Sequence, residues 1–345
     1  MDRHDLTRML IESTVSRTLN QMRRDPNRSV RNLVDLGVTF SKGRFQKTFL
    51  ELTQTMLENQ QSAYYDLLDR LVQQVSHETL KTFGVNLGYE GLTRGAETIR
   101  SIEAIGSYNI PWMLAMDCGS GGLDICTLRD IIRQGIGQGV RAYSLMGADV
   151  ELPVVQELCE AFPHCAFLLW TGGDALLEQG LESLSDCHNL FVALEIDTTA
   201  AETELEAAEA LAAGGLFYGI CRRYTDETCI APAVLERYLD YHPAAVILLP
   251  GVPAAFSLSQ VLYQQIKSLR MAQKYPYFLL EGIQDSLYVD RIISGDGCLL
   301  YIHGDGRALG VDQNGDRPAG NILDAPLVGL LRQALPKAQP ERREG

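Results

Sequence analysis

The feature that most constrains this chain is a regular alternation of two kinds of segment between residues 110 and 274. Apolar runs of strand length are each followed by a segment whose apolar residues recur at helical spacing. Six such pairs predict βα units, which are typical of a parallel sheet with right-handed crossovers. Strands that are apolar on both faces fit either a barrel or a doubly wound sheet. The predicted strands are Trp112–Met116, Arg141–Leu145, Ala166–Trp170, Leu190–Ile196, Leu216–Cys221 and Ala245–Leu249, and the predicted helices are Leu128–Gly137, Val154–Phe162, Asp174–Leu181, Thr203–Ala213, Ala231–Tyr241 and Leu258–Lys274.

Different patterns flank this alternation. Residues 1–82 carry helical apolar stripes, one of them from about Val30 to Leu36, and predict a small α-helical bundle. Four glycines between residues 84 and 95 predict a tight bend, so residues 83–109 are expected to connect the bundle to the sheet. The Asp305-Gly306 pair between Leu299–His303 and Arg307–Val311 predicts a β-hairpin. The expected domains are therefore 1–82, 83–109, 110–285, an extension over 286–336 and a tail over 337–345.

Charge limits the classes of partner. The net charge of −14 over 345 residues argues against nucleic acid as the main partner, because phosphate backbones repel an acidic chain. Residues 1–48 hold ten Lys and Arg against five Asp and Glu, a local +5 that leaves −19 on the rest. A solvated helix face is the favoured interpretation of this basic segment. The alternative is a docking segment for an acidic partner, such as a second copy of the chain.

The N-terminus and the cysteines indicate a cytoplasmic protein. The first ten residues are charged and lack the apolar stretch of a secretory signal, and no apolar run approaches the length of a membrane span. Eight scattered cysteines include no C-x-x-C pair, and the six histidines have no metal-binding spacing. We therefore expect mostly buried thiols and no metal site.

Short motifs at the ends of successive strands carry a family resemblance. Gly147-Ala148-Asp149-Val150 follows the second strand, Thr171-Gly172-Gly173 the third, and Ala193-Leu194-Glu195-Ile196 lies in the fourth. In order and spacing they resemble Gly-Gly-Glu-Pro, Thr-Asn-Gly and Ser-Leu-Glu-Gly of radical S-adenosylmethionine enzymes with six βα units. Phe217–Thr225 resembles the fifth strand of one bacterial branch of that family. The resemblance implies an α/β fold with a partial TIM-like (β/α)6 barrel, after an N-terminal helical bundle and before a small hairpin and helix.

The C-terminal region resembles the family's SPASM extension, but the cluster ligands are missing. Leu300–Gly306 and Ala319-Gly320-Asn321-Ile322 resemble the extension's glycine-rich pattern. The family's first loop carries C-x-x-x-C-x-x-C, whose thiolates hold a [4Fe–4S] cluster, whereas here it holds only Cys118 before Gly122. The extension's cysteines are also absent. A [4Fe–4S] cluster is therefore not expected.

This degenerate resemblance leaves catalysis uncertain and favours a protein that is not an enzyme. The leading interpretation is a binding or scaffolding protein whose partner is a second copy or an intact radical S-adenosylmethionine relative. The runner-up is a cluster-independent enzyme, or a small-molecule binder, that uses Asp149 and Glu195 at the barrel mouth. No cofactor is predicted, although S-adenosylmethionine would bind weakly if the family's cofactor positions still line a site. Those positions are Gly147, Ala148, Asp149, Thr171, Gly172, Gly173 and Glu195.

Overall fold

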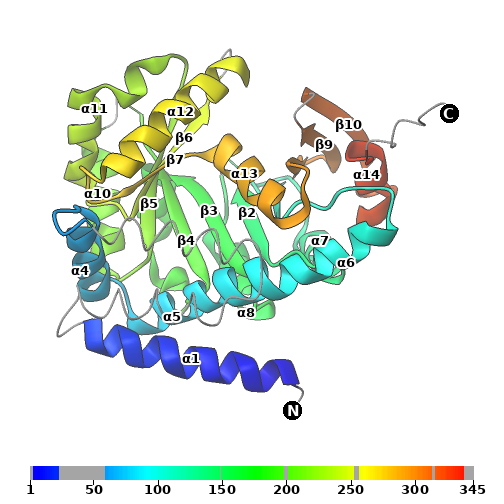
Figure 1. Ribbon diagram of the computed structural model, residues 1–345, viewed down its shortest axis with the longest axis horizontal. Helices are drawn as coiled ribbons and strands as arrows, with labels where there is room; N and C mark the ends of the chain where they lie inside the picture. Colours follow the sequence, from blue (N-terminus) through cyan, green and yellow to red (C-terminus); the bar gives the residue numbers. More distant parts are fainter. Residues whose placement is uncertain are drawn as a thin grey trace.

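A computed structural model describes residues 3–22, 59–147, 149–197, 201–251, 256–312 and 315–337. The fold is a mixed α/β arrangement around one sheet (Figure 1). The predicted helix near Val30, together with Arg23, Arg24, Arg28 and Arg31 of the basic segment, lies outside the described residues, as do Ala148 and most of the predicted tail.

Ten strands form the sheet in the order β10-β9-β8-β1-β2-β3-β4-β5-β6-β7. Strands β1 to β7 run parallel in chain order, β8 pairs in parallel with β1, and β9 and β10 continue antiparallel. The order begins at β10 and ends at β7, so pairing among the described strands does not close into a ring. The strands are β1 Met113–Asp117, β2 Ala142–Met146, β3 Ala166–Gly172, β4 Leu190–Glu195, β5 Tyr218–Tyr224, β6 Ala245–Pro250, β7 Phe278–Glu281, β8 Cys298–Ile302, β9 Arg307–Asp312 and β10 Gly315–Asn321.

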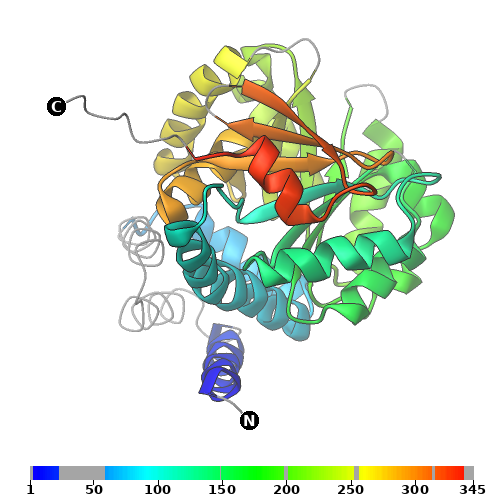
Figure 2. The same cartoon turned by 90° about the vertical axis from the view of Figure 1, so that its right-hand side faces the viewer.

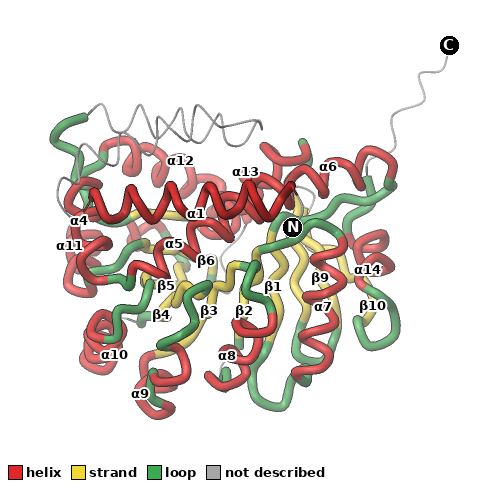
Figure 3. Tube along the Cα trace, turned by 90° about the horizontal axis from the view of Figure 1, so that it is seen from below, coloured by secondary structure: helices red, strands yellow, loops and turns green. Residues whose placement is uncertain are grey.

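Helices follow the parallel strands as the alternating pattern predicts. Asp124 begins the first of them by accepting a hydrogen bond from the Thr127 N–H, the geometry of a helix N-cap. In Figure 3, α7, α8, α9 and α10 lie on one side of the strands, and α12, α13 and α6 lie on the other. The helices are α7 Ile125–Gly137, α8 Leu152–Ala161, α9 Gly173–Gln179, α10 Ala201–Ala213, α11 Pro232–Arg237, α12 Phe256–Ala272, α13 Gly282–Ser294 and α14 Leu327–Ala334.

The two faces of the sheet have separate cores, because side chains alternate along each strand. The larger core joins the helices to one face of the sheet and includes Leu145, Leu169 and Val192. The smaller core covers the opposite face, which we call the inner face, and includes Trp170 and Phe191.

The glycine-rich segment is helical, so the predicted tight bend is wrong. Helix α5 (His77–Val85) continues through a π-helical segment, Asn86–Gly95, into α6 (Ala96–Ile105). Gly95 lies against the carbonyl of Gly139, where a Cβ would collide with that oxygen. Here the glycine serves close packing of a helix on a loop rather than a turn.

Two further helices flank this run at the amino ends of the strands. Helix α1 (Arg3–Met22) packs on α5, and α4 (Tyr64–Gln74) precedes α5 in the chain. Leu19 and Met22 of α1 pack with Tyr65 and Val72 of α4. Figure 1 shows α5 and α6 along the lower ends of the strands, with α1 outside them.

The predicted hairpin is confirmed and is joined to the main sheet. Strands β8 and β9 pair antiparallel around the Asp305-Gly306 turn, and β8 also pairs with β1. Helix α14 packs across β9 and β10 in Figure 2. Strand β7, helix α13 and strand β10 were not predicted. The expected domain limits stay predictions.

Candidate functional site

The amino ends of the strands are covered by α5 and its π-helical continuation. Phe83 of α5 lies 6.1 Å from Phe191 of β4 and 5.3 Å from Phe217, measured between ring centroids. These rings fill the amino end of the inner face with apolar contacts. A ligand site is therefore better sought at the carboxyl ends, where parallel α/β folds place their chemistry.

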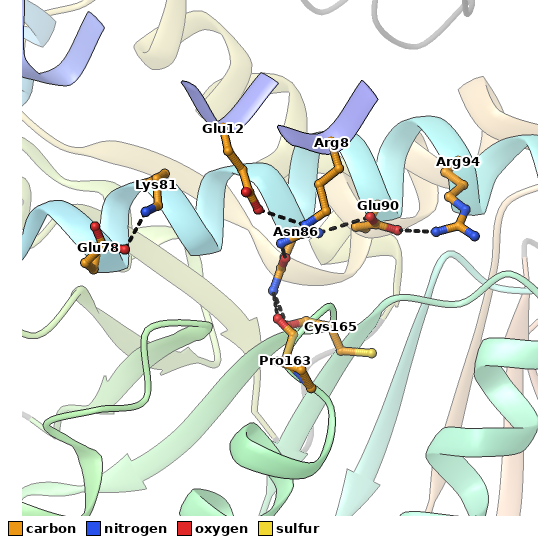
Figure 4. A network of polar contacts seen from close by, with 9 residues as sticks. All are labelled: Arg8, Glu12, Glu78, Lys81, Asn86, Glu90, Arg94, Pro163 and Cys165. Carbon is orange, nitrogen blue, oxygen red and sulfur yellow. Dashed lines mark hydrogen bonds and ion pairs between the residues drawn. The ribbon is translucent and has the colours of Figure 1, made fainter. Parts of the chain in front are cut away.

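The polar groups at the amino end bind one another. The Asn86 side-chain amide donates to the carbonyls of Pro163 and Cys165, both at 2.8 Å, and its oxygen accepts from Arg8 at 2.9 Å (Figure 4). The loop before β3, the π-helical segment and α1 are thus joined through one buried amide.

Glu90 extends this network to a buried carboxylate. Its side chain is 2% exposed and lies between Arg8, at 3.0 Å, and Arg94, at 3.3 Å. Arg8 also binds Glu12 at 2.8 Å within α1. A buried charge that is paired and hydrogen-bonded holds structure together, and it leaves little capacity for a ligand.

Asp290 of α13 plays the same part beneath β1 and β8. It accepts hydrogen bonds from the backbone N–H groups of Trp112 and Cys298 and from the Cys298 thiol, at 2.9–3.0 Å. Burial raises the pKa of Asp290 to about 8, although hydrogen bonds from Cys298 and Trp112 act against that rise. This carboxyl group fixes the beginnings of two neighbouring strands.

The carboxyl ends of the strands carry a different set of polar side chains on the inner face. We call this set the carboxyl rim. Strand β8 is in register with β1, and β4 is in register with β5. Because side chains alternate between the two faces along each strand, the side chains of this set all point to the inner face. The carboxyl rim consists of Asp117 of β1, Glu195 of β4, Arg223 of β5, Tyr301 of β8 and His303 just after β8.

Asp117 is surrounded by glycines from three loops. Its Oδ1 accepts a hydrogen bond of 2.9 Å from the Gly119 N–H. A Cβ on Gly147, where φ is +143°, would lie 2.8 Å from that oxygen, and one on Gly304 would lie 3.3 Å from Oδ2. Only glycine allows the loops after β2 and β8 to approach this carboxylate so closely.

Tyr301 and His303 lie next to Asp117 in the sheet register. Tyr301 pairs with Ala115, two residues before Asp117 on the same face, and its ring is 4.5 Å from the His303 ring. Burial raises the pKa of the Tyr301 phenol, the Asp117 and Cys118 groups raise it further, and Arg223 opposes them. The phenol therefore stays protonated and can donate a hydrogen bond.

Glu195 and Arg223 form an ion pair on neighbouring strands. The Arg223 Nη2 lies 3.0 Å from the Glu195 Oε1, and the two side chains are 55% and 39% exposed. Such exposed pairs contribute little to stability, so both groups can exchange partners.

An apolar surface lies beneath these polar groups. Alternation along the strands places Met146, Trp170 and Cys221 on the inner face, within three residues of the carboxyl ends of their strands, and all three belong to the smaller core. The Trp170 indole N–H donates to the Ser144 hydroxyl at 2.5 Å, which fixes the ring. Apolar walls with a few convergent polar groups are typical of small-molecule sites.

Some of the residues predicted from sequence reach this edge. Gly147 follows β2, Gly172 and Glu195 end β3 and β4, and a Cβ on Gly172 would have no heavy atom within 4 Å. Asp149 is exposed in the loop after β2. Ala148 cannot be placed because it lies outside the described residues.

Thr171 and Gly173 face away from the carboxyl rim. Thr171 follows Leu169 on the helix-facing side of β3, where its hydroxyl is buried and has no hydrogen-bond partner among the described residues. Gly173 packs on α10, with the Thr203 carbonyl and Ala207 Cβ at 3.2–3.3 Å from its added Cβ. The seven predicted positions therefore do not form one cluster.

The cysteines are mostly buried free thiols, as predicted, and only Cys126 is exposed. Burial and the neighbouring Asp117 raise the pKa of Cys118 to about 12, so this thiol stays protonated at neutral pH. Within the described ranges, no group of three or more His, Cys, Asp and Glu side chains could hold a metal ion. None of the helices in those ranges is long and apolar enough to span a bilayer.

Sequence reasoning did not identify Asp117, Arg223, Tyr301 or His303 as site residues. Arg223 follows Cys221 by two residues in the same strand, so alternation could have placed it on the same face. Tyr301 and His303 could not be found in this way, because β8 joins β1 from far along the chain.

Comparisons with known proteins do not place the chain in a family. No family model matches it, and no curated protein matches it. Among solved structures, human mitochondrial enolase superfamily member 1 is similar at 12% identity, covering 86% of this chain and 73% of that chain, with a TM-score of 0.36.

The assignment to the radical S-adenosylmethionine family is therefore wrong. No family model supports it. The motifs that suggested it are glycines and acidic residues at the ends of parallel strands. Every βα unit needs tight turns and helix caps at these points, so such motifs recur in parallel α/β folds and do not identify one family.

Proposed function

We propose that this protein binds a small organic molecule at the carboxyl rim and acts as a binding protein rather than an enzyme. The observation that carries the proposal is the convergence of Asp117, Glu195, Arg223, Tyr301 and His303 on one edge of one face of the sheet. The opposite edge is filled by Phe83 and its partners, so the two ends of the inner face differ in access.

The proposal includes a partial barrel, which is the finer part of the fold prediction. Helices α8 and α12 both pack on the helix-facing side of the sheet, through Val155 and Leu158 in one case and Leu262 and Ile266 in the other. Figure 3 nevertheless places these helices on opposite sides of the strands, which supports a strongly curled sheet. Curling would enclose the inner face and bring β5 toward β8.

The chemistry of the carboxyl rim suits binding better than covalent catalysis. Cys118 is protonated, and Tyr301 is a neutral hydrogen-bond donor. Asp149 is exposed, and Glu195 is paired with Arg223, so the two carboxylates considered for acid–base work do not face a shared reacting group. What remains is a set of donors and acceptors above an apolar surface.

A blocking substitution tests the proposal. Gly172→Leu adds bulk at the end of β3, where the added Cβ has open space, so the fold should tolerate it. Gly137→Leu is the matched control, since it lies at the exposed end of α7 and also has open space. Ligand-observed NMR with a metabolite library, including S-adenosylmethionine and adenosine, should identify binders that Gly172→Leu weakens at least about tenfold.

The control should retain the affinity of the unmodified protein for the same compounds. Binders that are unaffected by Gly172→Leu would show that the ligand site lies elsewhere. A library that yields no binder at all would contradict the proposal itself.

A further inference from the structure

We propose that the ligand of the carboxyl rim is a small organic cation whose ammonium group binds the Asp117 carboxylate. The inference rests on the proposed function and narrows it to one chemical class. It is argued from the charges of the rim, the surroundings of Asp117 and the side chains next to it.

The charges of the carboxyl rim favour a cation. Arg223 is already neutralised by Glu195 at 3.0 Å. Asp117, by contrast, has no ion pair with any residue that the structure describes, and its hydrogen bond there is the one from the Gly119 N–H. The charges of Asp117, Glu195 and Arg223 sum to −1, and the carboxylate without an ion pair among the described residues is that of Asp117.

One oxygen of Asp117 is free to receive a donor. Oδ1 is used by the Gly119 N–H, whereas Oδ2 has no hydrogen-bond partner among the described residues. Gly304 lies next to Oδ2 without a side chain that could cover the oxygen. An ammonium group that approaches Oδ2 would form a charge-assisted hydrogen bond.

The neighbours of Asp117 suit the rest of an organic cation. Tyr301 lies on β8 next to Asp117, paired with Ala115 two residues before it, and the face of a tyrosine ring attracts a cation. Met146 pairs with Asp117 across β1 and β2 and offers an apolar side chain to a carbon skeleton. A metal ion fits less well, because the described residues include no group of three acidic, histidine or cysteine side chains.

The test compares probes of equal length and different charge. n-Butylammonium and isobutylammonium are the cationic probes, with 1-butanol and butyrate as the uncharged and anionic analogues of n-butylammonium. Titrations followed by NMR should show the cations binding at least about fivefold more tightly than 1-butanol, with butyrate weakest. Asp117→Asn keeps the acceptor for the Gly119 N–H and removes the charge, so it should weaken the cations about tenfold or more and leave 1-butanol unchanged.

Asp130→Asn is the matched control, because it removes the same charge from an exposed position on α7. It should leave the affinity for each cation within about twofold. Equal binding of 1-butanol and n-butylammonium, with both weakened by Gly172→Leu, would overturn the inference while the proposed function stands. Failure of both cations to bind at 10 mM or below would also overturn it, and the metabolite library would then decide the proposed function separately.

Discussion

The two ends of the sheet contain similar polar groups in opposite states. At the amino end, Asn86, Glu90 and Asp290 are buried and have several hydrogen-bond partners each. At the carboxyl end, Asp117 has one hydrogen bond, and the Glu195–Arg223 pair is exposed. Carboxylates and arginines therefore hold the fold together at the amino end, and they are available to bind a ligand at the carboxyl end.

This difference indicates that the amino end of the sheet contributes stability and that the carboxyl end provides binding capacity. A buried polar group that loses its partner costs the full desolvation penalty, so the amino end is sensitive to substitution. Solvent replaces lost partners at the carboxyl end, so substitutions there should change binding more than stability. The first two predictions below compare one residue from each end.

The largest effect is expected from Asp290→Ala. The backbone N–H groups of Trp112 and Cys298 would lose their acceptor inside the protein, at about 1–3 kcal/mol each, so the free energy of unfolding should fall by about 3–5 kcal/mol. Asp117→Ala should cost about 1 kcal/mol or less, because water can accept from the half-buried Gly119 N–H. Urea unfolding followed by circular dichroism measures both. Equal losses would remove the distinction between the two ends.

A smaller effect is expected from the two ion pairs. Arg8→Ala leaves the buried Glu90 with Arg94 alone and removes a donor from Asn86, so stability should fall by about 2 kcal/mol. Arg223→Ala breaks an exposed pair and should cost about 0–1 kcal/mol.

Hydrogen exchange measures how the Arg8→Ala substitution changes the local stability of individual helices and strands. Amides of α1 should lose protection in Arg8→Ala while those of β1 to β6 keep it, because Arg8 joins α1 to the π-helical segment. Unchanged protection in α1 would show that the apolar contacts of Leu19 and Met22 alone hold the helix.

Local patterns predicted the parallel strands well. Apolar runs such as Ala166–Trp170 and Ala245–Leu249 are confirmed to within two residues, because buried parallel strands are apolar on both faces. The glycine-rich helix was missed because Gly95 serves packing against Gly139, a contact that lies about forty residues away along the chain. Strand β7 has only four residues, too few for a clear pattern.

The candidate site was predicted only in part, because some of its residues are brought together by contacts between segments that are far apart along the chain. Residues at or just after the end of a strand, such as Glu195 and Gly147, follow from locating the strands. Asp117 and His303 become neighbours only when β8 pairs with β1, which no local pattern indicates. The basic segment was interpreted through charge alone, whereas Arg8 is paired within the chain, with Glu12 and Glu90. Docking of a partner on this segment stays a prediction.

The smallest single step, about 1 kcal/mol per pH unit, is a dependence of stability on pH that belongs to the amino end. Asp290 has a pKa of about 8 in the folded protein and about 4 when unfolded. Between these values the folded protein holds a proton that the unfolded chain has released. Stability therefore falls as the pH rises through this interval, by up to about 1.4 kcal/mol per unit, and this contribution to the slope ends above pH 8.

Asp290→Asn isolates this contribution, because an amide has the shape of a protonated carboxyl group and does not ionise. Buried Glu281, whose pKa is also raised by burial, acts in the same direction in both proteins and cancels in the comparison. Urea unfolding at pH 5.5, 6.5 and 7.5 should show the unmodified protein losing about 1 kcal/mol per pH unit relative to Asp290→Asn. If the two profiles are parallel, the buried carboxyl carries no proton at neutral pH, and the contrast between the two ends then rests on hydrogen bonding alone.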